Sequence, residues 1–372
     1  MNPRLWQNPW RLMLVVNVAV CFGVFLHKIA LPPYVPYIHL LADYHFGFTK
    51  RALIGTVVAL FSSKVPVWLV FALGGAAWLV TLGLYIELFR RTFGFGERTM
   101  PLFVFMAGSP FFLKNFMHTL GHFDIYGCAL AMVLLLIPAR SIAFVVVAAL
   151  FSMILIHHIH FLMYVPTIVV IVMLRYYLVQ GFTRANALVG LAAMAGVALL
   201  FLAAQFDGTM PIPEADFVRY LQTRMTDPTR TDLLSFSYIW YQPLSKELQD
   251  TWARMPSNLL GVPVFALLIW LHTPLWRYFA ELIRALSNDV HRRIVIAALV
   301  LVSVAYLIIF ATVFDYSRWI SNWAVCMFLI LHAVKALPAL QAVPPIAAND
   351  KKTTIFGWIV TLVPRVGIVR PF

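Results

Sequence analysis

The sequence predicts an all-α, polytopic transmembrane helix bundle of about ten spans. Its 372 residues are 62% hydrophobic and only 12% charged, whereas a soluble domain has about 25% charged residues. The mean hydropathy is +0.85. These values exclude a disordered chain, a coiled coil and an ordinary soluble enzyme. Because a span needs about 20 apolar residues, the chain can hold about ten spans and one sizeable loop.

Each expected span is an apolar run between charged or turn-forming residues. The ten runs cover residues 10–28, 64–90, 99–114, 124–139, 141–157, 161–180, 185–205, 258–275, 293–313 and 319–337. A shorter amphipathic or re-entrant helix is expected at 52–62, and the stretch 355–363 is too short to span comfortably and is expected on the surface. We therefore expect one transmembrane domain at 1–340, with outer loops at 29–63 and 206–257, and a cytoplasmic tail at 341–372.

The charge distribution predicts that both termini lie in the cytoplasm. With this topology most of the 28 Lys and Arg residues lie inside and most of the 15 acids outside, as the positive-inside rule requires. The net charge of +13 then follows from topology, so we expect no nucleic-acid partner. The three cysteines lie in apolar runs without a CxxC spacing and are expected to be small core residues.

Acidic and basic residues on the expected outer face form the first candidate site. Asp43, in the segment ADYHFGFTKRALIG, is the only acid before residue 86, and a carboxylate there can act as a general base on a hydroxyl acceptor. Lys50 and Arg51 follow it and could bind a phosphate near the membrane surface. A solvated turn before a basic helix start is the simpler alternative.

The segment FDYSRW supplies a second pair, Asp315 and Arg318. Arg318 could hold a phosphate with two hydrogen bonds while Asp315 orients it. The simpler alternative is an ion pair between the two residues across one helical turn.

Histidines form the third feature of the outer face. His118 and His122 are four residues apart, which places two imidazoles on one helical face as a possible metal pair. His158 and His160 of the HHIH segment are further candidate ligands, and Asp124 lies beside the first pair. Hydrogen-bonding histidines at the membrane interface, or histidines that bind sugar hydroxyls, are the alternatives. A divalent metal therefore stays possible.

This layout resembles the GT-C class of integral membrane glycosyltransferases, through its many apolar helices, its acid-bearing first outer loop and the amphipathic helix that follows. The local motifs are DYHFGFTKR and FDYSRW. The resemblance implies transfer of a sugar from a polyprenyl-phosphate carrier to a glycan, lipid or protein acceptor outside the cytoplasmic membrane. Asp43 would be the catalytic base and Asp124 the second acid. The residues expected to bind substrate or phosphate are Lys50, Arg51, His45, Asp315, Arg318, His118 and His122. The paired acids common in the first loop of that class are absent.

Three alternatives are kept. A surface-polysaccharide polymerase or ligase would also use lipid-linked sugars and have a large outer loop. A lipid or sugar transporter would have charges in mid-span, and the expected spans hold almost none. A histidine-box oxidoreductase would need about eight histidines on the cytoplasmic side. The expected location is the inner membrane of a bacterium, in contact with membrane lipid.

Overall fold

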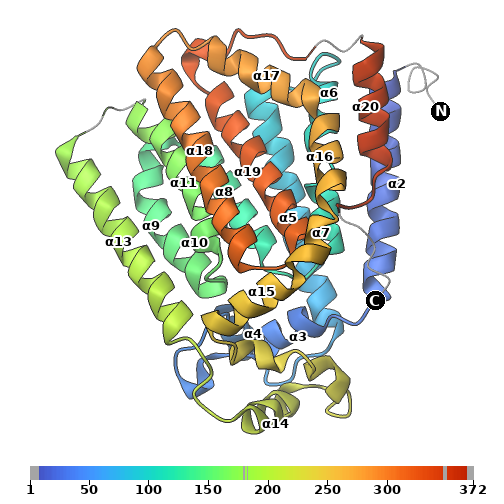
Figure 1. Cartoon of the computed structure of the whole chain (residues 1–372), viewed down its shortest axis with the longest axis vertical. Coiled ribbons are helices and arrows are strands. Elements are labelled where there is room, and N and C mark those ends of the chain that lie inside the picture. Colours follow the sequence, from blue (N-terminus) through green and yellow to red (C-terminus); the bar gives the residue numbers. More distant parts are fainter. Residues whose placement is uncertain (1–7, 179–180, 182, 347–349, 367–372) are drawn as a thin grey trace.

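The computed structural model describes residues 8–178, 181, 183–346 and 350–366. Over these residues the chain is helical, with one isolated β-bridge between Val65 and Met225. Most of the long helices run side by side between two ends of the molecule (Figure 1). The all-α bundle that the sequence predicts is confirmed.

Five helices are long and apolar enough to cross a membrane, which identifies an integral membrane protein. They are α2 (Pro9–Ile29), α5 (Trp68–Phe93), α9 (Ala139–Ile156), α13 (Arg184–Phe206) and α18 (Asp289–Thr312). A sixth span exists if α15 (Leu244–Leu259) and α16 (Val262–Leu271), which meet at 64°, form one crossing. The described chain thus has five or six candidate spans, and the prediction of about ten is wrong.

Part of the excess arose because three apolar runs do not form single helices; runs 124–139 and 319–337 do form helices, but neither helix is among the candidate spans. Run 99–114 is broken into α6 (Met100–Met106) and α7 (Leu113–His118). Run 161–180 contains α10 (His160–Met163), α11 (Val165–Val172) and the π-helical segment η2 (Met173–Tyr177), and run 258–275 is divided among α15, α16 and α17 (Thr273–Arg284). Apolar side chains inside a bundle give the same hydropathy as side chains facing lipid, so hydropathy counts both.

Helices α8 (Asp124–Leu136) and α19 (Tyr316–Lys335) lie inside the bundle. Most side chains of α19 are buried, and α19 packs on α5, α8, α11 and α18. Both helices begin at the same end of the molecule, with a charged residue in the first turn. That placement brings the two charged side chains together, as described below.

The predicted tail is part of the bundle. After the short helix η5 (Pro338–Leu340), helix α20 (Lys351–Leu362) packs along α2 and against α6 and α16 (Figure 1). The Lys114 ammonium donates hydrogen bonds to the carbonyl oxygens of Val360, Thr361 and Val363 at 2.6–3.0 Å. Helix α20 is therefore integrated into the bundle rather than part of a surface tail. The last residues of the predicted tail, 367–372, lie outside the described part of the chain.

The two predicted outer loops fold together into one unit, which we call the cap (residues 30–67 and 207–250). Its elements are α3 (Tyr34–Leu41), η1 (Tyr44–Phe46), α4 (Leu53–Phe61), α14 (Glu214–Arg224), η3 (Thr231–Leu234), η4 (Ser237–Trp240) and the start of α15. The cap has its own apolar core, which includes Tyr37, Phe217 and Trp240. Backbone hydrogen bonds from Lys50 to Gly208 and from Val65 to Arg224 join its two halves. The cap closes one end of the bundle (Figure 1).

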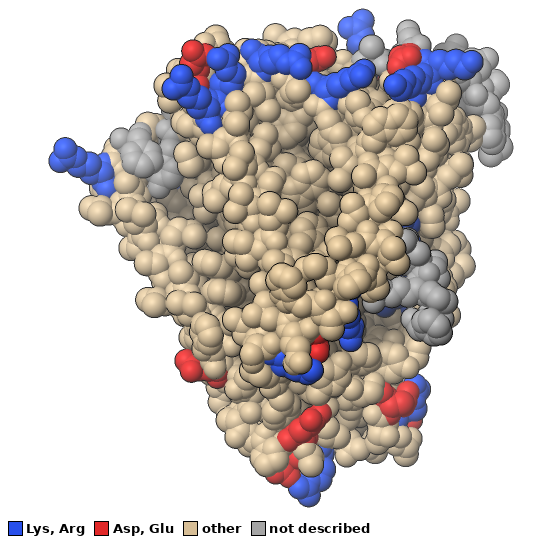
Figure 2. Space-filling view, viewed as in Figure 1, with Lys and Arg blue, Asp and Glu red and all other residues tan. Residues whose placement is uncertain are grey.

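Basic side chains concentrate at the opposite end of the bundle, which we call the basic end. Figure 2 shows a row of Lys and Arg there, with few acids. Exposed Lys and Arg residues at the ends of α5, α17 and α20 are Arg90, Arg91, Arg277, Arg284, Lys351 and Lys352. The two ends of the bundle thus differ in charge, as expected for a protein with a fixed orientation in the membrane.

Candidate functional site

A buried ion pair lies where α8 and α19 begin, beneath the cap. Nε and Nη2 of Arg318 donate to the two carboxylate oxygens of Asp124. Only 14% of the Arg318 side chain and 1% of the Asp124 side chain are exposed. Asn322 adds a hydrogen bond of 3.2 Å to Asp124 Oδ2, and the Tyr164 hydroxyl donates to Asn322 Oδ1 at 2.7 Å. The carboxylate is therefore ionised and fixed in orientation.

Four buried histidines form a group of neighbouring rings, and His39, His157 and His160 lie near this pair. His157, His158 and His160 lie at the turn between α9 and α10, and His39 comes from α3 in the cap. The ring centroid of His157 lies 6.5 Å from that of His39, 5.4 Å from that of His158 and 5.9 Å from that of His160. His160 approaches α8 closely because residue 127 is glycine: a Cβ there would meet the imidazole at 2.9 Å.

The histidines near the cap are neutral. Burial, and then the positive charge of Arg51, lowers the pKa of His39, His157 and His158 well below the ordinary value. Among the described residues, neither ring nitrogen of His39 has a hydrogen-bond partner, nor does Nδ1 of His157 or of His158. Buried polar atoms without partners cost free energy, so a cluster of them is typical of a site that binds a polar ligand.

Among the described residues of this region, Arg51 is the cation without a partner. No hydrogen bond or ion pair to its guanidinium is found in the described part of the chain, and its Nε is fully enclosed. Burial lowers the pKa of Arg51 to about 10; Arg318 acts in the same direction, and Glu247 and Asp124 oppose it. Arg51 and Arg318 both act electrostatically on His39 and His157. The two arginines therefore converge on one region.

Arg51 also has an unusual backbone conformation. Its φ is +66°, and it is the only described non-glycine residue with positive φ. The left-handed region costs an L-residue about 1–2 kcal/mol. Such conformations cluster at functional sites, where the surrounding structure enforces them.

Lys50, by contrast, has partners within the cap. Its ammonium donates to the Gln242 carbonyl oxygen at 3.0 Å and lies 3.6 Å from Glu247 Oε1. Only 1% of the side chain is exposed, and burial lowers its pKa to about 8. The two neighbouring cations of the predicted phosphate site thus have different surroundings, and Arg51 is the one left available to a ligand.

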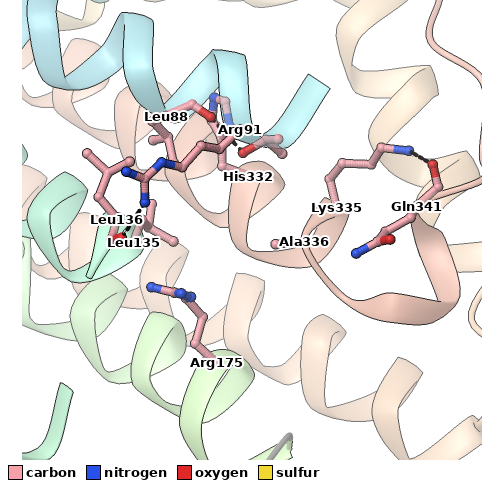
Figure 3. A pocket seen from close by; sticks show the side chains of 10 residues that line it. Leu88, Arg91, Leu135, Leu136, Arg175, His332, Lys335, Ala336 and Gln341 are labelled. Atoms are coloured by element: carbon pink, nitrogen blue, oxygen red, sulfur yellow. Dashed lines mark hydrogen bonds between the residues drawn. The ribbon is translucent and has the colours of Figure 1, made fainter. Parts of the chain in front are cut away.

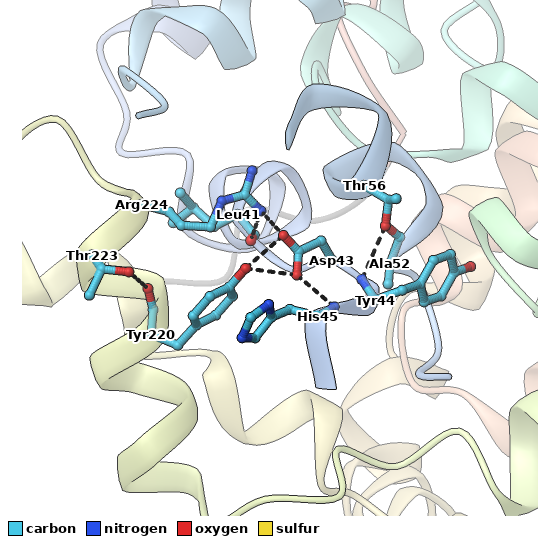
Figure 4. Close-up of polar contacts among 9 residues, drawn as sticks. All are labelled: Leu41, Asp43, Tyr44, His45, Ala52, Thr56, Tyr220, Thr223 and Arg224. Carbon is cyan, nitrogen blue, oxygen red and sulfur yellow. Dashed lines mark hydrogen bonds and ion pairs between the residues drawn. The ribbon is translucent and has the colours of Figure 1, made fainter. Parts of the chain in front are cut away.

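Asp43 holds the two halves of the cap together (Figure 4). Arg224 Nη1 donates to Asp43 Oδ2 at 2.7 Å, and the Tyr220 hydroxyl lies 2.7 and 2.9 Å from the two carboxylate oxygens. The backbone N–H of His45 donates to Oδ1 at 3.0 Å, and the His45 ring stacks on Tyr220. The described contacts do not join Asp43 to Asp124, so the two predicted acids belong to separate groups.

Other predicted pairings differ from those in the structure. Arg318 pairs with Asp124, while Asp315 accepts a hydrogen bond from Ser317 Oγ, so the alternative of an Asp315–Arg318 ion pair is wrong. His118 Nε2 lies 3.1 Å from Arg365 Nη1, a residue expected on the inner side. In the described chain no group of three or more His, Cys, Asp or Glu residues could hold a metal ion. The candidates His118, His122, His158 and His160 are therefore not assembled into a metal site.

The sequence did not single out His39, Tyr220, Arg224 or Asn322. His39 is the one strongly polar residue in the apolar run YVPYIHLL, which is a weak signal of function. Tyr220 and Arg224 are four residues apart and share one face of α14, but nothing in the sequence indicates that this face meets Asp43.

Comparisons with known proteins give no relative. No family model matches the chain, and no curated protein or solved structure matches it significantly.

Proposed function

We propose that the protein is a membrane glycosyltransferase that moves a sugar from a polyprenyl-phosphate carrier to a glycan, lipid or protein acceptor at the cap end. The Arg51 guanidinium, which has no partner in the described part of the chain and lies near the buried Asp124–Arg318 pair, is the observation that supports this proposal. A partly buried cation that has no anion among the described residues is costly, and a phosphate ligand offsets that cost with charge-assisted hydrogen bonds.

The charge asymmetry supports an orientation for the proposal. If the basic end faces the cytoplasm, the cap faces the outer side, and a donor in the outer leaflet reaches the site from the bilayer. A lipid donor of this kind is consistent with a buried site at the end of a helix bundle. The inner membrane of a bacterium is the location we propose.

We propose a separate role in the reaction for each of these residues. Arg51 and Arg318 bind the donor phosphate and stabilise the charge that grows on it as the sugar leaves. The acceptor oxygen forms a bond to the anomeric carbon, and the bond from that carbon to the phosphate oxygen breaks. The phosphate leaves with the electron pair, and the acceptor proton passes to Asp124. Asp43 joins the two halves of the cap by pairing with Arg224.

The decisive experiment compares surface glycans and glycolipids by mass spectrometry in cells with the gene, without it, and with the Arg51→Gln variant. Loss of one defined sugar in the last two strains, with accumulation of its polyprenyl carrier form, is the expected result. Arg219→Gln is the matched control, because Arg219 is an exposed cap residue paired with Asp216.

The other outcomes identify the alternatives. Shortened glycan chains that keep every sugar would indicate a polymerase or ligase. Unchanged glycans in the deletion strain would contradict the proposal. A flux assay in liposomes would then test transport.

A further inference from the structure

A second group of cations lies at the basic end, far along the bundle from the cap. It surrounds a cavity of about 380 Å³ between α5, α8, η2 and the end of α19 (Figure 3). Arg91, Arg175 and Lys335 line this cavity, and no acidic side chain of the described residues lines it. The cavity is therefore positively charged and separate from the site proposed above.

Each of the three cations donates some of its hydrogen bonds to backbone carbonyl oxygens of the protein. Arg175 Nη1 donates to the carbonyl oxygens of Leu134 and Ile137 at the end of α8, at 2.6 and 3.0 Å. The Lys335 ammonium donates to three carbonyl oxygens between residues 340 and 343. Arg91 donates to the Leu136 carbonyl oxygen and pairs with Glu87. These hydrogen bonds fix the positions of the three cations around the cavity.

Two features of the cavity indicate that it takes an anion. Arg91 and Arg175 are close enough to repel each other electrostatically, and an anion between them removes that repulsion. The second feature is the lining itself: Arg91, Arg175 and Lys335 line the cavity, and no acidic side chain of the described residues does.

We propose that this cavity binds the phosphate group of an anionic membrane lipid from the leaflet at the basic end. The cavity lies between bundle helices, and Leu88, Leu135 and Leu136 give it an apolar wall beside the cations. Basic pockets between membrane helices at the cytoplasmic surface bind lipid headgroups in this way. The proposal does not depend on glycosyl transfer at the cap end.

The test is native mass spectrometry of the delipidated, purified protein in detergent. The probes are dioleoyl phosphatidylglycerol, dioleoyl phosphatidylcholine and inorganic phosphate, added separately. We expect the wild type to retain phosphatidylglycerol in preference to phosphatidylcholine, and Arg175→Gln to bind it about fivefold more weakly, as expected for one surface cation. Arg284→Gln is the control, because Arg284 is exposed at the same end and does not line the cavity.

Arg175 also binds carbonyl oxygens at the end of α8, so Arg175→Gln could weaken folding as well as lipid binding. A second variant separates these two effects. Arg91→Gln changes a side chain that is 54% exposed and is expected to weaken lipid binding in the same way. Binding of inorganic phosphate that both variants lose would assign the anion site to free phosphate. The proposal would be overturned if the wild type, Arg175→Gln and Arg91→Gln bound phosphatidylglycerol equally. It would also be overturned if the wild type bound no inorganic phosphate and did not prefer phosphatidylglycerol to phosphatidylcholine.

Discussion

Arg318 and Asp124 form a two-bond ion pair between residues that are 194 positions apart in the chain. The pair joins the first turns of α19 and α8, two helices in the interior of the bundle. Because both side chains are largely buried, each charge depends on the other for compensation. The pair therefore affects both the stability of the bundle and the charge of the candidate site.

Asp124→Asn and Arg318→Met should each lower the free energy of unfolding by about 3 kcal/mol, because each leaves a buried charge without its partner. The double variant should lose less than the sum of the two, since neither charge remains. Thermal and denaturant unfolding in detergent micelles measure the three values. Additive losses would show that the pair contributes nothing beyond its separate parts.

Asp43 has two possible roles that variants of its partner can separate. If Asp43 mainly holds the cap, Arg224→Met should reduce transfer as strongly as Asp43→Asn does, and both should speed proteolysis of the cap. Tyr220→Phe keeps the ion pair and should have a small effect, about 1 kcal/mol or less. Limited proteolysis and a transfer assay provide the readouts. An inactive Asp43→Asn with an intact cap, beside an active Arg224→Met, would instead assign the role of base to Asp43, as the sequence predicts.

The long lipid-facing helices and the unbroken interior helices α8 and α19 could be predicted from the sequence, but the breaks in other apolar runs could not. Runs 10–28 and 185–205 match α2 and α13 closely, because uninterrupted apolar residues between polar ends define both edges. Runs 99–114 and 161–180 are also largely apolar, yet they break into short helices. Tertiary packing decides those breaks, and hydropathy contains no information on it.

The candidate site could be predicted only in part. Arg51, Arg318, Asp124 and the HHIH segment were singled out because polar residues near span ends are unusual. Their partners were missed, since the Asp124–Arg318 pair and the Asp43–Arg224 pair each link segments far apart in the chain. A single sequence gives no signal for contacts of that range.

Lys50 should make stability depend on pH in the alkaline range. Its pKa in the folded protein is lowered to about 8, whereas an unfolded lysine has a pKa of about 10.4. Between these values the unfolded chain binds more protons than the folded one, so Lys50 contributes a gain in stability as the pH rises from about 8 to about 10.

Lys50→Met removes this contribution. The unfolding free energy of the wild type should therefore rise relative to that of the variant as the pH increases from about 8 to about 10. Lys246→Met is the control, because Lys246 is exposed at the start of the same helix as Glu247. Thermal unfolding in detergent at several pH values measures the shift. A difference that stays constant from pH 7 to pH 10 would place the pKa of Lys50 near its ordinary value.

Arg51→Gly should separate function from stability. Glycine adopts φ near +66° without the cost of about 1–2 kcal/mol that an L-residue incurs, but it adds about 0.5–1 kcal/mol of backbone entropy to the unfolded chain. The variant also removes a cation that has no described partner. The unfolding free energy should therefore stay within about 1 kcal/mol of the wild type.

Transfer by Arg51→Gly should nevertheless fall by about 10²–10³, the usual effect of removing one donor to a developing negative charge. Arg51→Lys keeps the charge but not the two-bond geometry, so its activity should lie between those of the wild type and Arg51→Gly. The two measurements are a transfer assay and thermal unfolding on the same preparations. A variant that loses several kcal/mol of stability would show that Arg51 supports the fold, whereas a stable variant with full activity would remove Arg51 from the site.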